Sequence, residues 1–236
     1  MGKRTIPASH EPLADRYARS LLVVTQEQQE SFREKTVAVI GCGGLGGSII
    51  DQLARLGVGH LIIADGDVFE SSNLNRQLLC TEELVGQKKI DAAINRVRAV
   101  NSAVEITAFD EFFGEGNCHE ILSGAYIAVD ALDSSAGRRL LGKACEELGI
   151  PLVHGAIQGW HAQATVCMPG SRRMEMLYGH DFKPASKGSL PFTPPFCASI
   201  EVAQVTELLC GERPTLADKL LLLDMRTMET TLLKLS

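Results

Sequence analysis

The chain has 236 residues, of which 45% are hydrophobic and 5% aromatic, and its formal net charge at pH 7 is −6. This composition is typical of a single α/β domain with an aliphatic core. The sequence contains no block of lysines and arginines, which argues against a nucleic-acid-binding protein. No apolar run reaches the ~18 residues of a membrane span, and we expect neither a membrane protein nor a signal peptide.

The seven cysteines are odd in number, and no two of them form a C-x-x-C pair. We therefore expect reduced thiols in a cytoplasmic protein rather than a framework of disulfides. Cys197 lies at the start of a predicted helix, where a thiol can have a lowered pKa. We interpret it as a small core residue, and a covalent role is the alternative.

Hydrophobic periodicity divides the chain into alternating strands and helices. Residues 1–12 are expected to lack regular structure, and residues 15–35 to form an interrupted helix. Strands are predicted at residues 36–40, 60–64, 104–109, 126–130, from 151 onwards, at 162–168 and twice within 220–235. Helices are predicted at residues 44–56, 87–100, 135–148 and 200–209, and a long loop at 169–195.

Strands that alternate with helices form βαβ units. We therefore predict an α/β fold of the Rossmann type, with a mostly parallel sheet and helices on both faces. Antiparallel strands are expected at the C-terminus. Residues 1–236 form a single nucleotide-binding domain in this interpretation, with an N-terminal helical segment at 1–35.

A glycine-rich turn follows the first predicted strand. It contains four glycines in a G-x-G-x-x-G pattern, Gly41, Gly43, Gly44 and Gly46. Such a turn lets the backbone approach a phosphate, and the helix N-terminus that follows favours negative charge. Asp65, about 20 residues further on, ends the second strand, where a carboxylate accepts ribose hydroxyls; Asp67 lies beside it. The pattern predicts a nucleotide site but does not separate ATP from NAD.

A polar block after the second strand favours a triphosphate. Asn73, Arg76 and Gln77 follow this strand, and Lys89 begins the next helix. Two cations and an amide at the carboxyl edge of a sheet suit a charged phosphate chain, whereas a nicotinamide does not need them. The alternative is a solvated loop with a helix-capping lysine. Because Lys88 precedes Lys89, the sequence leaves open which lysine faces the phosphates.

A further carboxylate lies after the strand at 126–130. Asp133 follows this strand at the edge where α/β sheets bind ligands. Opposite a triphosphate it would hold Mg²⁺, which takes one or two carboxylates and keeps several waters. Asp133 and Ser134 also suit the N-cap of the helix at 135–148, and the two roles are compatible.

Together these segments resemble the ThiF/MoeB/HesA family, the bacterial relatives of ubiquitin-activating enzymes. The resemblance extends from Arg16 to Leu235 and rests on ordered motifs, which are more specific than the glycine turn alone. The motifs are residues 16–19 (RYAR), 41–46, 65–67, 72–77, 86–89, 132–134, Arg138 and 191–194.

The resemblance implies an ATP-dependent adenylyltransferase. Such an enzyme activates the C-terminal Gly-Gly carboxylate of a small ubiquitin-like sulfur-carrier protein, in a pathway of the thiamin or molybdenum cofactor type. It implies that Arg76 and Lys89 bind the phosphates, Asp133 the Mg²⁺, and that Arg19 reaches the partner subunit's active site in a homodimer. The residues implied at the nucleotide are Gly41, Gly43, Gly44, Gly46, Asp65, Asp67, Ser72, Asn73, Arg76, Gln77, Lys89, Leu132, Asp133 and Ser134.

The sequence departs from the family pattern in two places. Members often carry two C-x-x-C pairs that bind a structural zinc, but residues 171–176 contain no cysteine and no second pair follows. We therefore expect no zinc. A glutamine commonly follows the second N-terminal arginine of the family, and this chain has Ser20 there.

Two other functions are compatible with the fold. An NAD-dependent oxidoreductase would explain the glycines and Asp65, but it would leave Asn73, Arg76, Lys89 and Asp133 without a role. A non-catalytic relative would keep the fold and bind a partner. The sequence does not identify the carrier protein, its pathway or the role of residues 169–195.

Overall fold

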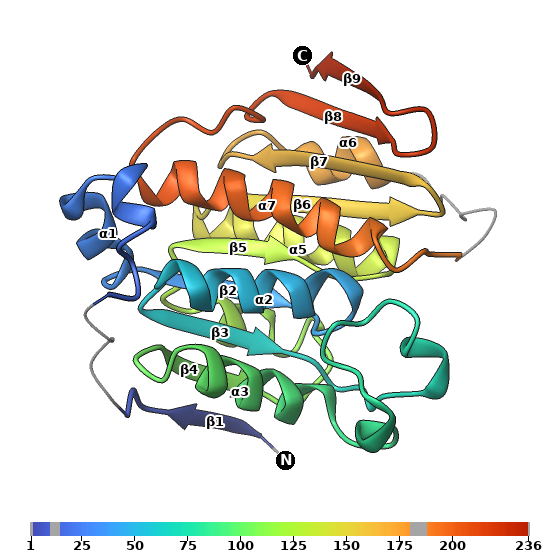
Figure 1. The fold of residues 1–236 in the computed structure, drawn as a ribbon. Coiled ribbons are helices and arrows are strands. Elements are labelled where there is room, and N and C mark those ends of the chain that lie inside the picture. The colour runs from blue at the N-terminus through green and yellow to red at the C-terminus, as the bar shows by residue number, and fades with distance from the viewer. Residues whose placement is uncertain (1, 10–14, 180–187, 236) are drawn as a thin grey trace.

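The computed structural model describes residues 2–9, 15–179 and 188–235, and its centre is one nine-stranded sheet (Figure 1). The strand order is β1-β4-β3-β2-β5-β6-β7-β8-β9. The strands are β1 (Lys3–Ile6), β2 (Thr36–Ile40), β3 (His60–Ala64), β4 (Glu105–Phe109), β5 (Ile127–Asp130), β6 (Leu152–Gln158), β7 (His161–Cys167), β8 (Lys219–Asp224) and β9 (Glu229–Lys234).

Seven α-helices lie within the described residues, together with three short 3₁₀ helices. The α-helices are α1 (Gln26–Phe32), α2 (Gly44–Leu56), α3 (Lys89–Val100), α4 (Cys118–Leu122), α5 (Ser135–Leu148), α6 (Arg173–Tyr178) and α7 (Thr193–Leu209). The 3₁₀ helices are Ser20–Leu22, Ser71–Asn73 and Glu82–Leu84. No helix in this part of the chain combines the length and apolarity that crossing a bilayer requires.

The five central strands β4-β3-β2-β5-β6 are parallel. Their order is that of a Rossmann sheet, in which the chain leaves β2 first toward one edge and then returns to β5 on its other side. β2, β3 and β5 are mostly aliphatic because helices cover both of their faces. The predicted α/β fold is therefore confirmed.

Helices cover the sheet in two layers. Figure 1 shows α2, α3 and α7 on the face toward the viewer, with α5 behind the sheet. On the first face, residues such as Ile49, Leu53 and Val205 form the larger core with β2 and β3. On the second, Leu141 and Cys145 of α5 pack with Met174 of α6. Antiparallel strands flank the parallel centre at both edges, with β1 on β4 and β7, β8 and β9 beyond β6.

Three segments differ from the sequence prediction. Residues 1–12 were expected to lack regular structure, but Lys3–Ile6 pairs with β4 as an edge strand; its polar sequence carries no periodic signal because it is largely exposed. The helical segment predicted within 15–35 is limited to Ser20–Leu22 and Gln26–Phe32. Residues 10–14 lie outside the described part of the chain.

The loop predicted at 169–195 is shorter in the structure. Arg173–Tyr178 forms α6, which buries Met174 and Tyr178, and α7 begins at Thr193. Pro195 ends the predicted loop, but in the structure both Pro194 and Pro195 lie in the first turn of α7, where proline's missing N–H is not needed. Residues 180–187 of the predicted loop lie outside the described residues.

Candidate functional site

The carboxyl ends of three neighbouring parallel strands form the candidate site. Ile40, the last residue of β2, pairs with Ala64 of β3 on one side and with Asp130 of β5 on the other. The segments that follow these strands are the glycine turn, the Asp65–Asp67 segment and the loop that carries Asp133. Since β2 and β5 flank the point at which the strand order reverses, these segments lie where α/β sheets bind ligands.

The glycine turn is held tightly at both of its ends and is open at Gly43. Gly41 has a φ of +106°, and a Cβ atom there would lie 2.6 Å from the Ala131 carbonyl oxygen. A Cβ on Gly46 would lie 1.8 Å from the Gly41 carbonyl oxygen. A Cβ on Gly43 would meet its nearest neighbour, Gln77 Nε2, only at 3.7 Å. The outer glycines are thus required by packing, whereas Gly43 leaves the N-terminus of α2 open to an anion.

Asp65 braces the glycine turn from the next strand. Its Oδ2 accepts the Cys42 backbone N–H at 2.6 Å and its Oδ1 accepts the Asp67 N–H at 2.8 Å. Burial raises the pKa of Asp65, and the two backbone N–H groups oppose that rise. Because each carboxylate oxygen has a second lone pair, Asp65 can still accept hydroxyl groups from a ligand.

The structure distinguishes the two lysines. Lys89 is 7% exposed, and its Nζ lies 2.9 Å from Asp67 Oδ2 at the carboxyl edge of the sheet. Lys88 forms an ion pair with Asp110 instead. The Lys89 side chain therefore lies beside the Asp65–Asp67 segment, whereas that of Lys88 lies at the end of β4.

The polar block after β3 folds on itself. Asn73 is buried, and its Oδ1 accepts the Glu70 N–H at 3.1 Å, which stabilises the turn. Arg76 donates from Nη1 to the Ser72 carbonyl and to Asn75 Oδ1, both at 2.9 Å. Gln77 is buried beside the glycine turn, and within the described part of the chain its Oε1 has no hydrogen-bond partner. An unsatisfied buried amide is uncommon and points to a ligand or water at this place.

Asp133 and Ser134 take different positions at the start of α5. Ser134 is the N-cap residue, and its Oγ accepts the Gly137 N–H at 3.1 Å. Asp133 lies one residue before the cap and is exposed at the carboxyl edge. The capping role that the sequence allowed for both residues therefore belongs to Ser134.

Arg19 does not join these residues within one chain. Two residues before it in the chain, Tyr17 accepts a hydrogen bond from Asn101 at 3.0 Å. Arg16, beside Tyr17, donates to the Val100 carbonyl. Val100 ends α3, so this segment lies at the amino ends of the parallel strands, where α1 is seen in Figure 1. Arg19 is thus at the opposite edge of the sheet from Asp133.

A buried polar cluster beneath Asp133 was not predicted. Asp130 and His154 are both 0% exposed, and Asp130 Oδ2 lies 2.6 Å from His154 Nδ1. Tyr178 Oη lies 3.0 Å from His154 Nε2 and 3.2 Å from Arg138 Nη1. The available signal was the placement of Asp130 and His154 in otherwise apolar strands, since buried polar groups require partners. Burial lowers the pKa of His154.

Glu201 of α7 is a second buried polar group that the sequence did not reveal. It is 0% exposed, and among the described residues no group hydrogen-bonds to its Oε1. Its pKa is raised well above the usual 4.5, first by burial and then by the charge of Asp130. The nearby Cys197 is also 0% exposed, and burial raises its thiol pKa well above 9.0, so the structure favours a core role for Cys197.

We expect Glu201→Gln to change the pH dependence of stability. The folded protein binds a proton at Glu201 that the unfolded chain releases above pH 4.5, so wild-type stability falls as pH rises from that value toward the folded pKa. Each unit of raised pKa corresponds to about 1.4 kcal/mol. The neutral glutamine avoids this loss. The free energy of unfolding of the variant should therefore increase relative to that of wild type as pH rises, as measured by urea unfolding between about pH 5 and 9. Glu207→Gln, at a half-buried carboxylate of the same helix, is the control. Parallel curves of unfolding free energy against pH for Glu201→Gln and wild type would contradict the interpretation of Glu201 as a buried neutral acid.

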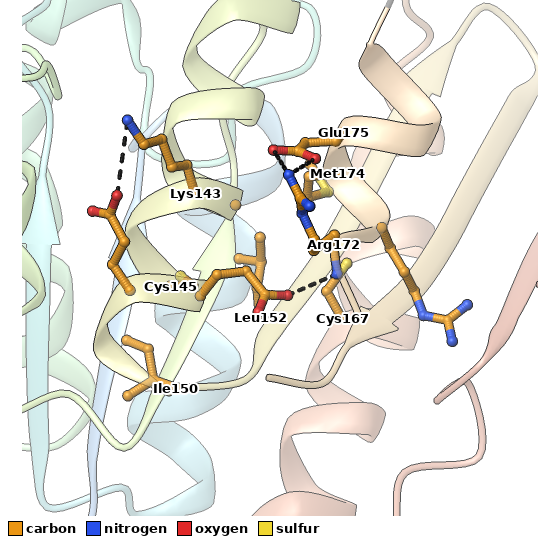
Figure 2. Close-up of a pocket in the computed structure, with 12 residues that line it drawn as sticks. Lys143, Cys145, Ile150, Leu152, Cys167, Arg172, Met174 and Glu175 are labelled. Atoms are coloured by element: carbon orange, nitrogen blue, oxygen red, sulfur yellow. Dashed lines mark hydrogen bonds and ion pairs between the residues drawn. The ribbon is translucent and has the colours of Figure 1, made fainter. Parts of the chain in front are cut away.

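A cavity of about 280 Å³ lies at a different place, between α5, α6 and the end of β7 (Figure 2). Its lining includes Leu152, the first residue of β6, which places it at the amino end of that strand. Cys145 and Cys167 also line it, and burial raises the pKa of both thiols. Glu146 Oε1 accepts the backbone N–H of Arg172 at 2.8 Å, which ties the start of α6 to α5. The cavity is remote from the glycine turn and from Asp133.

The comparisons with known proteins concern both the sequence and the fold of the chain, and they agree with each other. The model of the ThiF family matches residues 17–236. The chain is 35% identical over 218 residues to the SAMP-activating enzyme E1 of Haloferax volcanii, covering 89% of this chain and 81% of that protein. It is 35% identical over 224 residues to the sulfur carrier protein adenylyltransferase of Thermus thermophilus, covering 89% and 83%. The crystal structure of E. coli MccB with MccA-N7isoASN is similar in fold, with a TM-score of 0.81 over 98% of this chain and 74% of that chain at 20% identity.

Proposed function

The chain belongs to the ThiF family, and on that premise we propose that it is an ATP-dependent adenylyltransferase that activates the C-terminal carboxylate of a carrier protein. The observation that carries the proposal is the convergence of the glycine turn, the Lys89–Asp67 pair and Asp133 at one edge of the sheet. A nucleoside triphosphate would use the glycine turn, the Lys89–Asp67 pair and Asp133. A nicotinamide dinucleotide would use only the glycine turn.

The residues at this edge suit ATP as a substrate. The open backbone at Gly43 and the N-terminus of α2 would receive phosphate oxygens, and Asp65 would accept ribose hydroxyls. Lys89 lies at the edge and Arg76 in the polar block beside it, so the two would neutralise the phosphate chain. Gln77, whose Oε1 is buried and lacks a partner among the described residues, supports a ligand group beside Gly43. Ser72, Asn73, Leu132 and Ser134 would form the surrounding walls.

The donor chemistry at the edge also fits Mg²⁺. Mg²⁺ prefers oxygen ligands and is usually held by one or two carboxylates together with substrate phosphates. The described residues contain no group of three or more His, Cys, Asp or Glu side chains that could hold a metal by themselves, which agrees with a phosphate-dependent site rather than a protein cage. Asp133 is the residue that would hold the ion. A bound Mg²⁺ ion would neutralise charge on the phosphates.

The proposed reaction needs positioning more than acid–base catalysis. A C-terminal carboxylate has a pKa near 3.5 and is ionised at neutral pH, so it can attack without a general base. Its oxygen forms a bond to the α-phosphorus of ATP, the bond from that phosphorus to the bridging oxygen breaks, and pyrophosphate leaves with the electron pair. The barrier is the approach of two anions, which Lys89 and Arg76 would lower.

The finer parts of the proposal concern the partner and the assembly. We propose a small ubiquitin-like sulfur carrier that ends in Gly-Gly, a cytoplasmic homodimer and no structural zinc. The names of the two relatives support a carrier protein as substrate. Thiamin and molybdenum cofactor pathways are both compatible with the residues of the site.

The test is ATP–pyrophosphate exchange with Mg²⁺ in the presence of a panel of small carriers that end in Gly-Gly. Exchange with one carrier, and none when its last glycine is deleted, supports the proposal and identifies the pathway. ATP binding without exchange by any carrier would indicate a non-catalytic relative. Binding of NAD(H) without ATP would contradict the proposal in favour of an oxidoreductase.

A further inference from the structure

The hydroxyl of Tyr178 is the meeting point of three side chains from three different elements. Arg138 Nη1 of α5 lies 3.2 Å from it, Gln163 Nε2 of β7 lies 3.0 Å from it, and His154 Nε2 of β6 lies 3.0 Å from it. Guanidinium and amide N–H groups can only donate, so the hydroxyl accepts from Arg138 and Gln163 and must donate to His154. All three hydrogen-bonding positions of the hydroxyl are then used.

This arrangement fixes the protonation of the histidine. Because His154 Nε2 accepts from Tyr178, its proton lies on Nδ1, which donates to Asp130 Oδ2 at 2.6 Å. The ring is fully buried, and burial lowers the pKa of His154, which agrees with a neutral imidazole. The ring of Tyr178 packs edge-on against that of His154, with centroids 5.4 Å apart.

The same cluster holds the peptide that precedes Asp133. Asp130 Oδ1 accepts the Leu132 N–H at 2.9 Å. Arg138 donates to the Leu132 carbonyl oxygen from Nη2 at 2.8 Å and from Nε at 3.2 Å. The Leu132 carbonyl belongs to the peptide unit that joins Leu132 to Asp133, so the orientation of that unit is set by Arg138.

Tyr178 belongs to a segment that is distant in sequence from this loop. It ends α6, and Arg139 of α5 donates to its carbonyl oxygen at 2.8 Å. The adjacent residues Arg138 and Arg139 therefore both contact Tyr178, one at the hydroxyl and the other at the backbone. At its other end α6 is tied to α5 through Glu146, which accepts the Gly170 and Arg172 N–H groups.

We propose that Tyr178 is a positioning residue for adenylation, whose hydroxyl holds the Leu132–Asp133 peptide in place through Arg138 and the His154–Asp130 pair. This inference rests on the proposed function only for its effect on rate; the mechanical coupling stands on the hydrogen bonds alone. Without the hydroxyl, Arg138 Nη1, Gln163 and His154 each lose a partner. The guanidinium then turns toward new acceptors and releases the Leu132 carbonyl. The segment after β7 is thereby coupled to the loop that carries Asp133.

The first test is hydrogen–deuterium exchange of the peptide fragments that contain residues 131–134. Tyr178→Phe keeps the ring and removes only the hydroxyl, and it should accelerate amide exchange in this loop by about tenfold. Met174→Ala is the control for a general loosening of α6, because Met174 is 3% exposed on the same helix and packs on Gly142, outside the polar cluster of Asp130, His154, Arg138 and Tyr178. Tyr126→Phe controls for loss of a hydroxyl at a surface position.

Two outcomes of the exchange measurement would overturn the coupling. One is wild-type exchange at residues 131–134 in Tyr178→Phe. The other is equal acceleration in Met174→Ala, which would mean that any loosening of α6 has the same effect. Acceleration confined to Tyr178→Phe supports the proposal whether or not a carrier has been found.

The second test connects the coupling to the reaction. In carrier-dependent ATP–pyrophosphate exchange, Tyr178→Phe should need a several-fold higher Mg²⁺ concentration for half-maximal rate, with little change in the KM for the carrier. Met174→Ala should leave that Mg²⁺ concentration unchanged. An unchanged Mg²⁺ requirement in Tyr178→Phe would contradict the proposal that Tyr178 affects the rate of adenylation. Wild-type protein without exchange activity would instead mean that the proposed function has failed, and the amide-exchange result would still decide the coupling.

Discussion

Replacing Asp133 by alanine is expected to lower carrier-dependent ATP–pyrophosphate exchange by about 10²-fold or more while leaving the fold intact. The carboxylate lies at the edge formed by the ends of β2, β3 and β5, where it would hold the Mg²⁺ that accompanies the triphosphate. Because Asp133 is exposed and Ser134 supplies the N-cap of α5, its loss should change the free energy of unfolding by no more than about 0.5 kcal/mol.

The matched control is Asp91→Ala. Asp91 is a half-exposed carboxylate of α3 that pairs with Arg4 at 2.6 Å, next to β1 rather than at the candidate site. This variant should exchange at the wild-type rate, and thermal unfolding of both variants establishes that they are folded. Near-normal exchange by Asp133→Ala would remove Asp133 from the active site.

Arg19→Ala should also abolish exchange, and mixing it with Asp133→Ala should restore part of it. Within one chain Arg19 lies at the amino edge of the sheet and Asp133 at the carboxyl edge, so in the proposed homodimer Arg19 would complete the neighbouring subunit's site. In a randomly mixed C₂ dimer, half of the molecules contain both variants and each of these has one intact site. About a quarter of wild-type activity should then return.

Each variant assayed alone is the control for this rescue, and sedimentation analysis establishes the oligomeric state of each mixture. Arg33→Ala tests the specificity of the effect, because Arg33 is an exposed arginine at the C-terminus of α1 in the same N-terminal region. It should leave activity unchanged. Inactive mixtures of folded mixed dimers, or a monomeric wild-type protein, would exclude a shared active site.

Much of the parallel sheet was predictable because its signals are local. The runs at 36–40 and 60–64 are β-branched and aliphatic, and the structure has strands with those same bounds. The helix predicted at 135–148 is α5 with unchanged bounds, since Ser134 caps its start and Gly149 in the left-handed conformation ends it. Strong periodicity and cap residues act within a few positions of one another, so they can be recognised without the fold.

Other segments could not be predicted because their conformation depends on distant residues. Lys3–Ile6 is a strand only because β4 offers a free edge, and α6 is ordered by contacts with Gly142, Glu146 and Arg139 of α5. The prolines at 194 and 195 illustrate the same limit, because a proline pair is compatible both with a loop and with the first turn of a helix.

The candidate site divides in the same way. By itself the sequence determined that a glycine turn, an acidic pair, a polar block and Asp133 would meet at the carboxyl edge, because parallel strands place the segments after them side by side. Only the tertiary structure placed Lys89 beside the Asp65–Asp67 segment and Lys88 at the end of β4, since Lys89 pairs with Asp67 and Lys88 with Asp110. Only the tertiary structure showed that Arg19 and Asp133 lie at opposite edges of the sheet. It also showed that four different elements contribute the residues of the buried polar cluster, Asp130, His154, Arg138 and Tyr178. Buried hydrogen bonds of this kind join residues far apart in the chain, and no local pattern specifies them.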